Sequence, residues 1–345
     1  MTKRNKIIWS RELTEQELKL LKLMADDEAQ EKNTRRRAQT ILAINATQDI
    51  ALGAQSAGVP LQTAKKYVAS FLEFGWQGLV TTPSPRGGDF LTRYDQGYWA
   101  ERLVKDLLER DKQYRAIPYG TSRSEPFTDR LRFSQYHLNE FLLNAYSFQS
   151  GRRWKRPDLL TVPRRLLFEE QGNDMWTPDL IHMDNEQCRS YVEAAGVAIE
   201  VETSLWQVKA AKVHLSFTIK QEDLSPLRNW IADNSVPLYV VQVFYDQAYA
   251  LSFKHFEYLI SEDAPAKRRI TPNEDRITKK FTFMVPLHEG NLLGDIPEPE
   301  VEGRIFKDDN GKVTVYGSLI GSSIEPAATQ IVQNLAKGNL LPPIL

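Results

Sequence analysis

Three carboxylates in the second half of the chain have the types and spacing of a divalent-cation site. Glu200 and Glu202 lie in the β-branched, alternating segment 197–203, and a strand there places both side chains on one face. Two carboxylates in an otherwise apolar strand are costly without a partner. Asp179, which follows Pro178, is the expected further ligand. Mg²⁺ prefers carboxylate oxygens, and a cation-bound water can attack a phosphodiester, so the expected chemistry is phosphodiester hydrolysis.

This pattern resembles the PD-(D/E)XK nuclease superfamily. In that superfamily a Pro-Asp pair and a later acidic-X-Lys motif meet across two adjacent strands, as Pro178-Asp179 and Glu200-Val201-Glu202 would here. Glu202 stands where lysine is usual, which leaves two routes open. Either Glu202 fills the position, as glutamate does in some restriction enzymes of the superfamily, or a lysine reaches in from the following helix. The implied catalytic set is Asp179, Glu200, Glu202 and Lys209.

The resemblance also implies helices on both sides of this site. The helix after the strand is expected over 204–212 and carries two candidate lysines, Lys209 and Lys212. Many members of the superfamily place a glutamate on a helix before the first strand. The segment 159–171 is expected to be that helix, with Glu170, or its neighbour Glu169, as a metal ligand beside Asp179 and Glu200.

The rest of the acidic half reads as alternating helices and strands. The run 236–245 is too continuously apolar to be half exposed, so it is expected to be a central strand. Helices are expected over 224–234 and 252–260, and further strands over 281–287 and 303–317. This order predicts a mixed sheet flanked by helices. The stretch 236–253 is similar to one found in type II restriction endonucleases, which implies sequence-specific, Mg²⁺-dependent cutting of double-stranded DNA by a homodimer.

Charge divides the chain of 345 residues into two unlike halves. Residues 1–157 hold 26 Lys and Arg against 18 Asp and Glu, whereas residues 158–345 hold 18 against 27. A basic segment attracts a polyanion, so the first half is expected to bind DNA. The predicted organisation is a helix-turn-helix DNA-binding domain over 1–85, a second helical DNA-binding lobe and linker over 86–157, and a PD-(D/E)XK-like nuclease domain over 158–345.

The basic half has the periodicity of helices. A capping box at Thr14-Glu-Gln-Glu17 predicts the first helix, and others are expected over 31–46, 49–57 and 61–74. Gly58-Val59-Pro60 is a tight break between the last two. A short helix, a glycine turn and a second helix are typical of the helix-turn-helix, whose second helix enters the major groove with its N-terminal residues. Those residues are Gln62, Thr63, Lys65 and Lys66.

Residues 34–79 resemble the N-terminal helix-turn-helix of insertion-sequence and mariner-like transposases. The matching features are Arg35-Arg36-Arg37-Ala38, the Gly58 turn and Gly75-Trp-Gln-Gly78. The resemblance makes Arg36 a DNA-binding candidate. It also implies a basic Pro/Gly linker, here Thr82 to Gly88, with Arg86 as a minor-groove candidate. Further helices, expected over 95–109 and 134–145, would form the second lobe.

Several classes of protein do not fit the composition. One cysteine, Cys188, excludes an intrachain disulfide and a cysteine-based zinc cluster, and indicates a reducing cytosol, which the resemblance to restriction endonucleases implies to be prokaryotic. No apolar run is long enough to span a membrane, and no Gly-rich phosphate loop predicts a nucleotide cofactor. The fold class expected is therefore mixed α+β, an all-helical first part followed by an α/β mixed-sheet domain. A transposition protein and a non-catalytic DNA-binding regulator remain the alternative functions.

Overall fold

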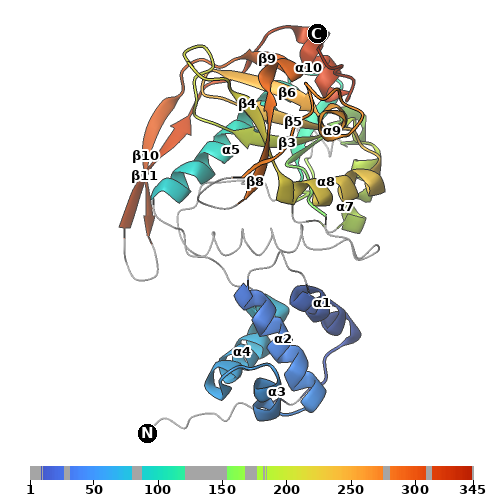
Figure 1. Cartoon of the computed structure of the whole chain (residues 1–345), viewed down its shortest axis with the longest axis vertical. Helices are drawn as coiled ribbons and strands as arrows, with labels where there is room; N and C mark the ends of the chain where they lie inside the picture. The colour runs from blue at the N-terminus through green and yellow to red at the C-terminus, as the bar shows by residue number, and fades with distance from the viewer. Residues whose placement is uncertain are drawn as a thin grey trace, which may run out of the picture. The chain divides into compact units, whose positions relative to one another are not determined.

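The computed structural model divides the chain into two compact units, residues 1–84 and 85–345 (Figure 1). The structure describes residues 9, 11–26, 32–79, 88–120, 154–167, 177–181, 183, 185–274, 280–307 and 313–343. The smaller unit is helical, and the larger one is a mixed sheet covered by helices on both faces, as the sequence predicts. None of the helices within the described residues is long and apolar enough to cross a membrane.

The helices of the smaller unit begin where side chains satisfy their first backbone N–H groups. Thr14 and Glu17 form the expected capping box, in which the amide of Thr14 donates to Glu17 Oε2 at 3.0 Å. Asp49 accepts hydrogen bonds from the amides of Ala51 and Leu52 and so begins the third helix. The elements are α1 Glu15–Asp26, α2 Lys32–Thr47, α3 Ile50–Ser56, α4 Leu61–Phe74 and the 3₁₀ helix Gly75–Leu79.

Glycines allow the close approach of these helices. Gly58, with φ at 62°, makes the turn between α3 and α4. Gly53 lies against α2, and a Cβ atom built on it would come 2.5 Å from the Cα of Ile44. The helices enclose a core that includes Ile41, Ile44, Val68 and Phe71. The four helices predicted for this part of the sequence are therefore confirmed, with ends shifted by one or two residues.

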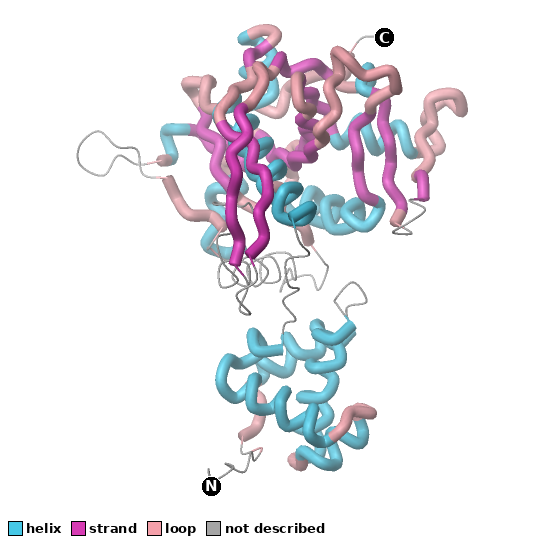
Figure 2. The backbone as a smooth tube through the Cα atoms, turned by 90° about the vertical axis from the view of Figure 1, so that its left-hand side faces the viewer, coloured by secondary structure: helices cyan, strands magenta, loops and turns pink. Residues whose placement is uncertain are grey.

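The larger unit is built on a seven-stranded sheet in the order β1-β2-β3-β5-β6-β9-β12. Only β3 and β5 pair in parallel; the other neighbours are antiparallel. Figure 2 shows the same unit turned by 90°. The strands are β1 Tyr114–Pro118, β2 Leu159–Pro163, β3 Val197–Thr203, β5 Leu238–Val243, β6 Gln247–Ser252, β9 Asn291–Asp295 and β12 Glu325–Pro326.

Two hydrophobic cores lie on the two faces of this sheet. One contains side chains of α7 Asn185–Glu193, α8 Gln221–Asn234 and α9 Phe253–Ile260, with the small sheet of β4 Ser216–Lys220, β8 Phe281–Pro286 and β7 Asn273–Glu274. The other contains side chains of α5 Gly88–Leu108 and α10 Thr329–Ala336. A separate hairpin, β10 Glu300–Lys307 and β11 Val313–Ile320, packs against α5.

Two helices expected next to the site are not formed. The first residues of 159–171 are strand β2, because Leu160 and Val162 enter one core while Leu159 enters the other. The segment 204–212 is an irregular loop with turns, because the carboxylate of Asp246 accepts the amide hydrogens of Val208 and Lys209. These two backbone N–H groups therefore donate to a side chain and not to the carbonyl groups of a preceding helical turn.

The segment expected as a second DNA-binding lobe is described only in part. The helix predicted over 95–109 is the C-terminal part of α5, whose buried face packs on β3 in the larger unit. The helix predicted over 134–145 and the candidate residues Arg86, Glu169 and Glu170 lie outside the described residues.

Candidate metal centre

Three carboxylates from two elements converge on one face of the sheet. Glu200 and Glu202 are on β3, and Asp223 is in the first turn of α8. Each offers a carboxylate oxygen, and these oxygens all lie within 4.8 Å of one another. Glu200 is buried, with 5% of its surface exposed, and the other two are half-buried. Three clustered oxygen ligands of this kind suit a hard divalent cation.

The local sequence explains why these three side chains meet. The two-residue period of β3 points Glu200 and Glu202 to the same face, while Ile199 and Val201 point to the opposite core. Strand β4, which contacts β5, leads directly into α8, so the start of this helix comes close to the two glutamates of β3. Asp223 lies in the first helical turn, where the partial positive charge of the helix N-terminus favours a carboxylate.

Lys155 connects two of the three carboxylates. Its Nζ donates to Glu200 Oε1 at 2.5 Å and to Asp223 Oδ2 at 3.0 Å. Burial alone would lower the pKa of Lys155, but the surrounding carboxylates, led by Glu200 and Asp223, raise its pKa well above the usual value. Lys220 Nζ lies 3.6 Å from Glu202 Oε1, and the charge of Glu202 raises the pKa of Lys220. Both amines therefore stay charged beside the cluster.

The surroundings of Glu200 oppose its ionisation. Burial, assisted by the nearby carboxylates, raises its pKa to about 8, although Lys155 acts in the opposite direction. Its Oε2 atom is buried and has no hydrogen-bond partner among the described residues. A buried carboxylate oxygen without a partner is destabilising unless a cation or solvent satisfies it.

A small cavity lies beside the cluster. It has a volume of about 10 Å³ and is bordered by the three carboxylates and by Lys220, among others. That volume is about what one water molecule or ion needs. The partnerless oxygen of Glu200, the hard-oxygen donor set and this cavity all fit a divalent cation.

A Pro-Asp pair lies directly beside Glu200, but it is not the pair singled out in the sequence. Asp158, preceded by Pro157, immediately precedes β2, which runs antiparallel to β3 with Leu159 opposite Ile199. Its Oδ2 accepts a hydrogen bond from the amide of Val201 at 2.7 Å. Pro157-Asp158 and Glu200-Val201-Glu202 thus meet across two adjacent strands.

The other sequence candidates lie outside this cluster. Asp179 is exposed in a turn-rich segment and does not belong to the group of three clustered carboxylates. Lys209 forms an exposed ion pair with Asp295 at 3.0 Å, and Lys212 is exposed. Of the proposed catalytic set, the structure brings together Glu200 and Glu202.

Sequence reasoning missed Lys155, Asp158 and Asp223. Lys155 falls within the segment 86–157, which the sequence predicts to be a DNA-binding lobe and linker, although this end of the segment leads into a Pro-Asp pair and an apolar run. That dipeptide before a β-rich run is the signal that could have identified Asp158. No comparable signal marks Asp223, because an acidic residue in a first helical turn is common.

The candidate DNA-binding residues of the smaller unit differ in exposure. Gln62 and Lys66 are exposed at the start of α4, whereas Thr63 and Lys65 are half-buried. Arg36, on α2, is exposed and its Nη2 donates to the carbonyl oxygen of Gly58 at 3.0 Å. Arg36 therefore also supports the turn between α3 and α4.

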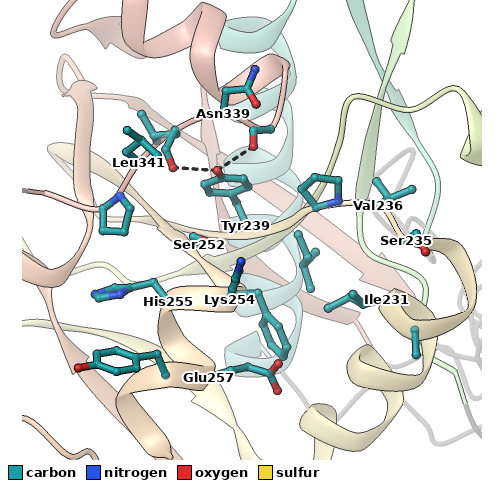
Figure 3. A pocket seen from close by; sticks show the side chains of 18 residues that line it. Ile231, Ser235, Val236, Tyr239, Ser252, Lys254, His255, Glu257, Asn339 and Leu341 are labelled. Carbon is teal, nitrogen blue, oxygen red and sulfur yellow. Dashed lines mark hydrogen bonds between the residues drawn. The ribbon is translucent and has the colours of Figure 1, made fainter. Parts of the chain in front are cut away.

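A much larger pocket lies elsewhere in the larger unit and contains none of the clustered carboxylates (Figure 3). Its volume is about 1040 Å³, and its wall is formed by the end of α8, the start of β5, α9 and the segment 338–342. The hydroxyl of Tyr239 lies 2.8 Å from the carbonyl oxygen of Leu340 and 3.2 Å from that of Gly338. The lining of this pocket is mainly apolar.

One comparison with known proteins links this unit to DNA cleavage. Residues 207–275 match a family model described as AccI restriction endonuclease. The matched segment includes β4, α8 with Asp223, and β5, the strand that pairs with β3. No curated protein and no solved structure matched the chain. The match supports a type II restriction endonuclease, an enzyme class that acts on double-stranded DNA and in general uses a divalent metal.

Proposed function

We propose that this protein is a Mg²⁺-dependent type II restriction endonuclease with a PD-(D/E)XK-like active site. The observation that carries the proposal is the convergence of Glu200, Glu202 and Asp223 around Lys155, opposite Asp158 on the adjacent strand. The cluster lies in the unit that contains the restriction-endonuclease match.

Each residue of the cluster has a role in this reaction. Glu200, Glu202 and Asp223 would hold the cation, which when bound supplies a Lewis acid and lowers the pKa of a water molecule. Asp158 holds the amide of Val201 and so fixes the backbone between the two glutamates. The attacking water oxygen would form a bond to phosphorus as the bond to the leaving oxygen breaks. The proton of the water would pass to Glu202 or to solvent, and the leaving oxygen would take a proton from solvent.

Lys155 is assigned the position that the superfamily gives to its lysine. Its ammonium group touches both Glu200 and Asp223 and carries the positive charge that the motif lacks at Glu202. A fixed positive charge at this point stabilises the negative charge that develops on the phosphate oxygens. Lys209, whose amine is engaged by Asp295, is the less suitable candidate.

The smaller unit is proposed to hold and read the DNA. The turn at Gly58 joins α3 to α4, and α4 presents Gln62 and Lys66 to solvent in its first two turns. Glutamine pairs with adenine, while lysine contacts guanine or phosphate. Arg36, Thr63, Lys65 and Arg86 complete the proposed DNA-binding set. Cutting both strands calls for a homodimer.

Digestion of a long, sequence-diverse DNA tests this proposal. Discrete fragments are expected with Mg²⁺ and not with EDTA, and they should disappear in Glu200→Gln and Asp223→Asn. Glu193→Gln, which changes an exposed carboxylate of α7, is the matched control and should leave the fragments unchanged. DNA that is bound in a gel shift yet stays intact with Mg²⁺ would overturn the proposal, as would fragments that persist in Glu200→Gln.

A further inference from the structure

The small sheet of β4, β8 and β7 has a buried face and an outward face. Every second side chain of β4 and β8 is buried in the core, as Phe217 and Phe283 are, so the residues that alternate with them point outward. The register sets Lys220 of β4 opposite Thr282 of β8, and Thr282 opposite Asn273 of β7. Directly opposed residues share a face, so these three lie in one line across the sheet and are called here the polar row.

The side chains of the polar row are accessible to a partner. Lys220 and Asn273 are exposed, and Thr282 is half-buried. Within the part of the chain that the structure describes, neither Thr282 nor Asn273 uses its side chain in a hydrogen bond. The row carries one positive charge and no negative charge. Its hydroxyl and amide groups are therefore available to a polar ligand that approaches the small sheet.

The polar row begins at the candidate metal centre. Lys220 Nζ lies 3.6 Å from Glu202 Oε1, and Lys220 borders the same small cavity as the three carboxylates. Strand β4 is held over the large sheet, because the amide and the hydroxyl of Thr218 both donate to Gln242 Oε1, at 3.0 and 3.1 Å. Gln242 is itself paired with Glu202 across β5 and β3. Hydrogen bonds between the two sheets therefore fix the row relative to the carboxylates.

The composition of the polar row suits the backbone of DNA. Lysine, threonine and asparagine side chains donate hydrogen bonds to phosphate oxygens in complexes of proteins with DNA. Of the carboxylates near the row, Glu202 is a proposed cation ligand, and Glu222, in the first turn of α8, is paired with Lys280 at 2.8 Å. Neighbouring strands lie about 4.8 Å apart, so the row is about 10 Å long. Because one DNA strand rises about 3.4 Å per nucleotide, the row spans about three nucleotides.

We propose that the polar row binds the sugar-phosphate backbone of the strand that is cut, over the nucleotides next to the scissile bond. The inference rests on the proposed function, which puts the scissile phosphate at the cation. Lys220 contacts the phosphate nearest to the cation, and Thr282 and Asn273 donate hydrogen bonds to the backbone farther along the strand. Because the row is fixed relative to the carboxylates, it determines which phosphate reaches the cation. Thr282 and Asn273 are thus positioning residues.

Binding of the full chain to labelled duplex DNA in EDTA tests the contact without cleavage. Thr282→Val/Asn273→Leu removes two hydrogen-bonding groups while nearly keeping the shapes of the side chains, so the fold should be kept, and circular dichroism checks this. The affinity should fall about tenfold or more, because each substitution removes a hydrogen bond to a charged backbone. Thr314→Val, at a half-buried threonine of β11, is the matched control and should bind like wild type. A double variant that binds as tightly as this control overturns the inference, and a wild type that binds no DNA overturns the proposed function as well.

Neutral phosphate analogues show where the polar row contacts the strand. Once digestion has identified the cut position, a methylphosphonate replaces, one at a time, the first three phosphates on each side of the scissile bond. In wild type, at least one replacement should slow single-turnover cleavage about tenfold or more, whereas Thr282→Val/Asn273→Leu, which lacks the contact, should be slowed less than about threefold further by the same replacement. Equal slowing in both proteins, or no slowing at any position, overturns the inference while leaving DNA cleavage intact. Weaker binding in the double variant together with a wild type that never cuts DNA contradicts the proposed function instead.

Discussion

The ammonium nitrogen of Lys155 lies 2.5 Å from a carboxylate oxygen of Glu200, although 45 positions separate the two residues in the chain. Lys155 precedes β2 and Glu200 is on β3, so the antiparallel pairing of these strands creates the contact. The same amine reaches Asp223 on α8. One half-buried ammonium group therefore balances carboxylates from two elements that also form the candidate metal centre.

Replacing Lys155 with methionine should destabilise the protein in a pH-dependent way. Without the amine, the already raised pKa of Glu200 rises further, and the uncharged carboxyl is tolerated at pH 6. At pH 9 the wild-type carboxylate is ionised and paired, whereas the variant must either ionise it without a partner or keep it protonated, so the loss should exceed that at pH 6 by about 1 kcal/mol. Urea unfolding at the two pH values measures the difference.

The control for this experiment is the double variant Lys155→Met/Glu200→Gln. It removes both charges, so most of the lost stability at pH 9 should return. Lys254→Met, at an exposed lysine of α9, should change the free energy of unfolding by less than about 0.5 kcal/mol. Equal losses at pH 6 and pH 9 in Lys155→Met would show that the ion pair is not the cause.

Asp158 and Asp179 each follow a proline, and matched substitutions show which of the two aspartates belongs to the active site. Asp158→Asn should lower the cleavage rate about 10–100-fold, because its carboxylate fixes the amide of Val201 between the two glutamates. Asp179→Asn should stay within about twofold of wild type, since the exposed Asp179 lies outside the cluster. Single-turnover cleavage of one plasmid substrate provides both rates. The reverse ranking would restore Asp179 as the ligand first expected from the sequence.

The affinity for a divalent cation should rise with pH. Burial raises the pKa of Glu200 to about 8, so below that pH the carboxyl must release a proton before it binds metal. The association constant should therefore increase by up to tenfold per pH unit between pH 6 and 8 and level off above. Calorimetric titration with Mn²⁺ in two buffers of different ionisation enthalpy measures both the affinity and the released proton. An affinity that is flat over this range would contradict the assignment of Glu200 as a ligand.

The sequence predicts the parts of the fold that depend on neighbouring residues. The alternation in 197–203 correctly places Glu200 and Glu202 on one face, and the capping box and the Gly58 turn mark the helices of the smaller unit. The central strand over 236–245 is confirmed as β5 because its continuous apolar run fits only a position buried on both sides.

The remaining features depend on contacts between distant segments. Residues 159–163 form a strand buried on both faces, and such a run shows no alternation that separates it from a helix. The helix expected over 204–212 is prevented by Asp246, which lies on the connection between β5 and β6 and captures two amides of the loop. Lys155 and Asp223 reach the site only because of the order in which the strands pair. The periodicity of a short segment carries no information about that order.

Lys66 should contribute a phosphate contact without sequence information. It is exposed at the start of α4, so Lys66→Ala should weaken binding to all DNA sequences similarly and reduce the slope of log affinity against log salt by about 0.9. Gln62→Ala, one turn earlier on the same helix, should instead change the preference among base sequences. Fluorescence anisotropy between 50 and 200 mM salt measures the slope, and Lys22→Ala on α1 is the matched control. A slope that Lys66→Ala leaves unchanged would mean that α4 does not face the DNA backbone.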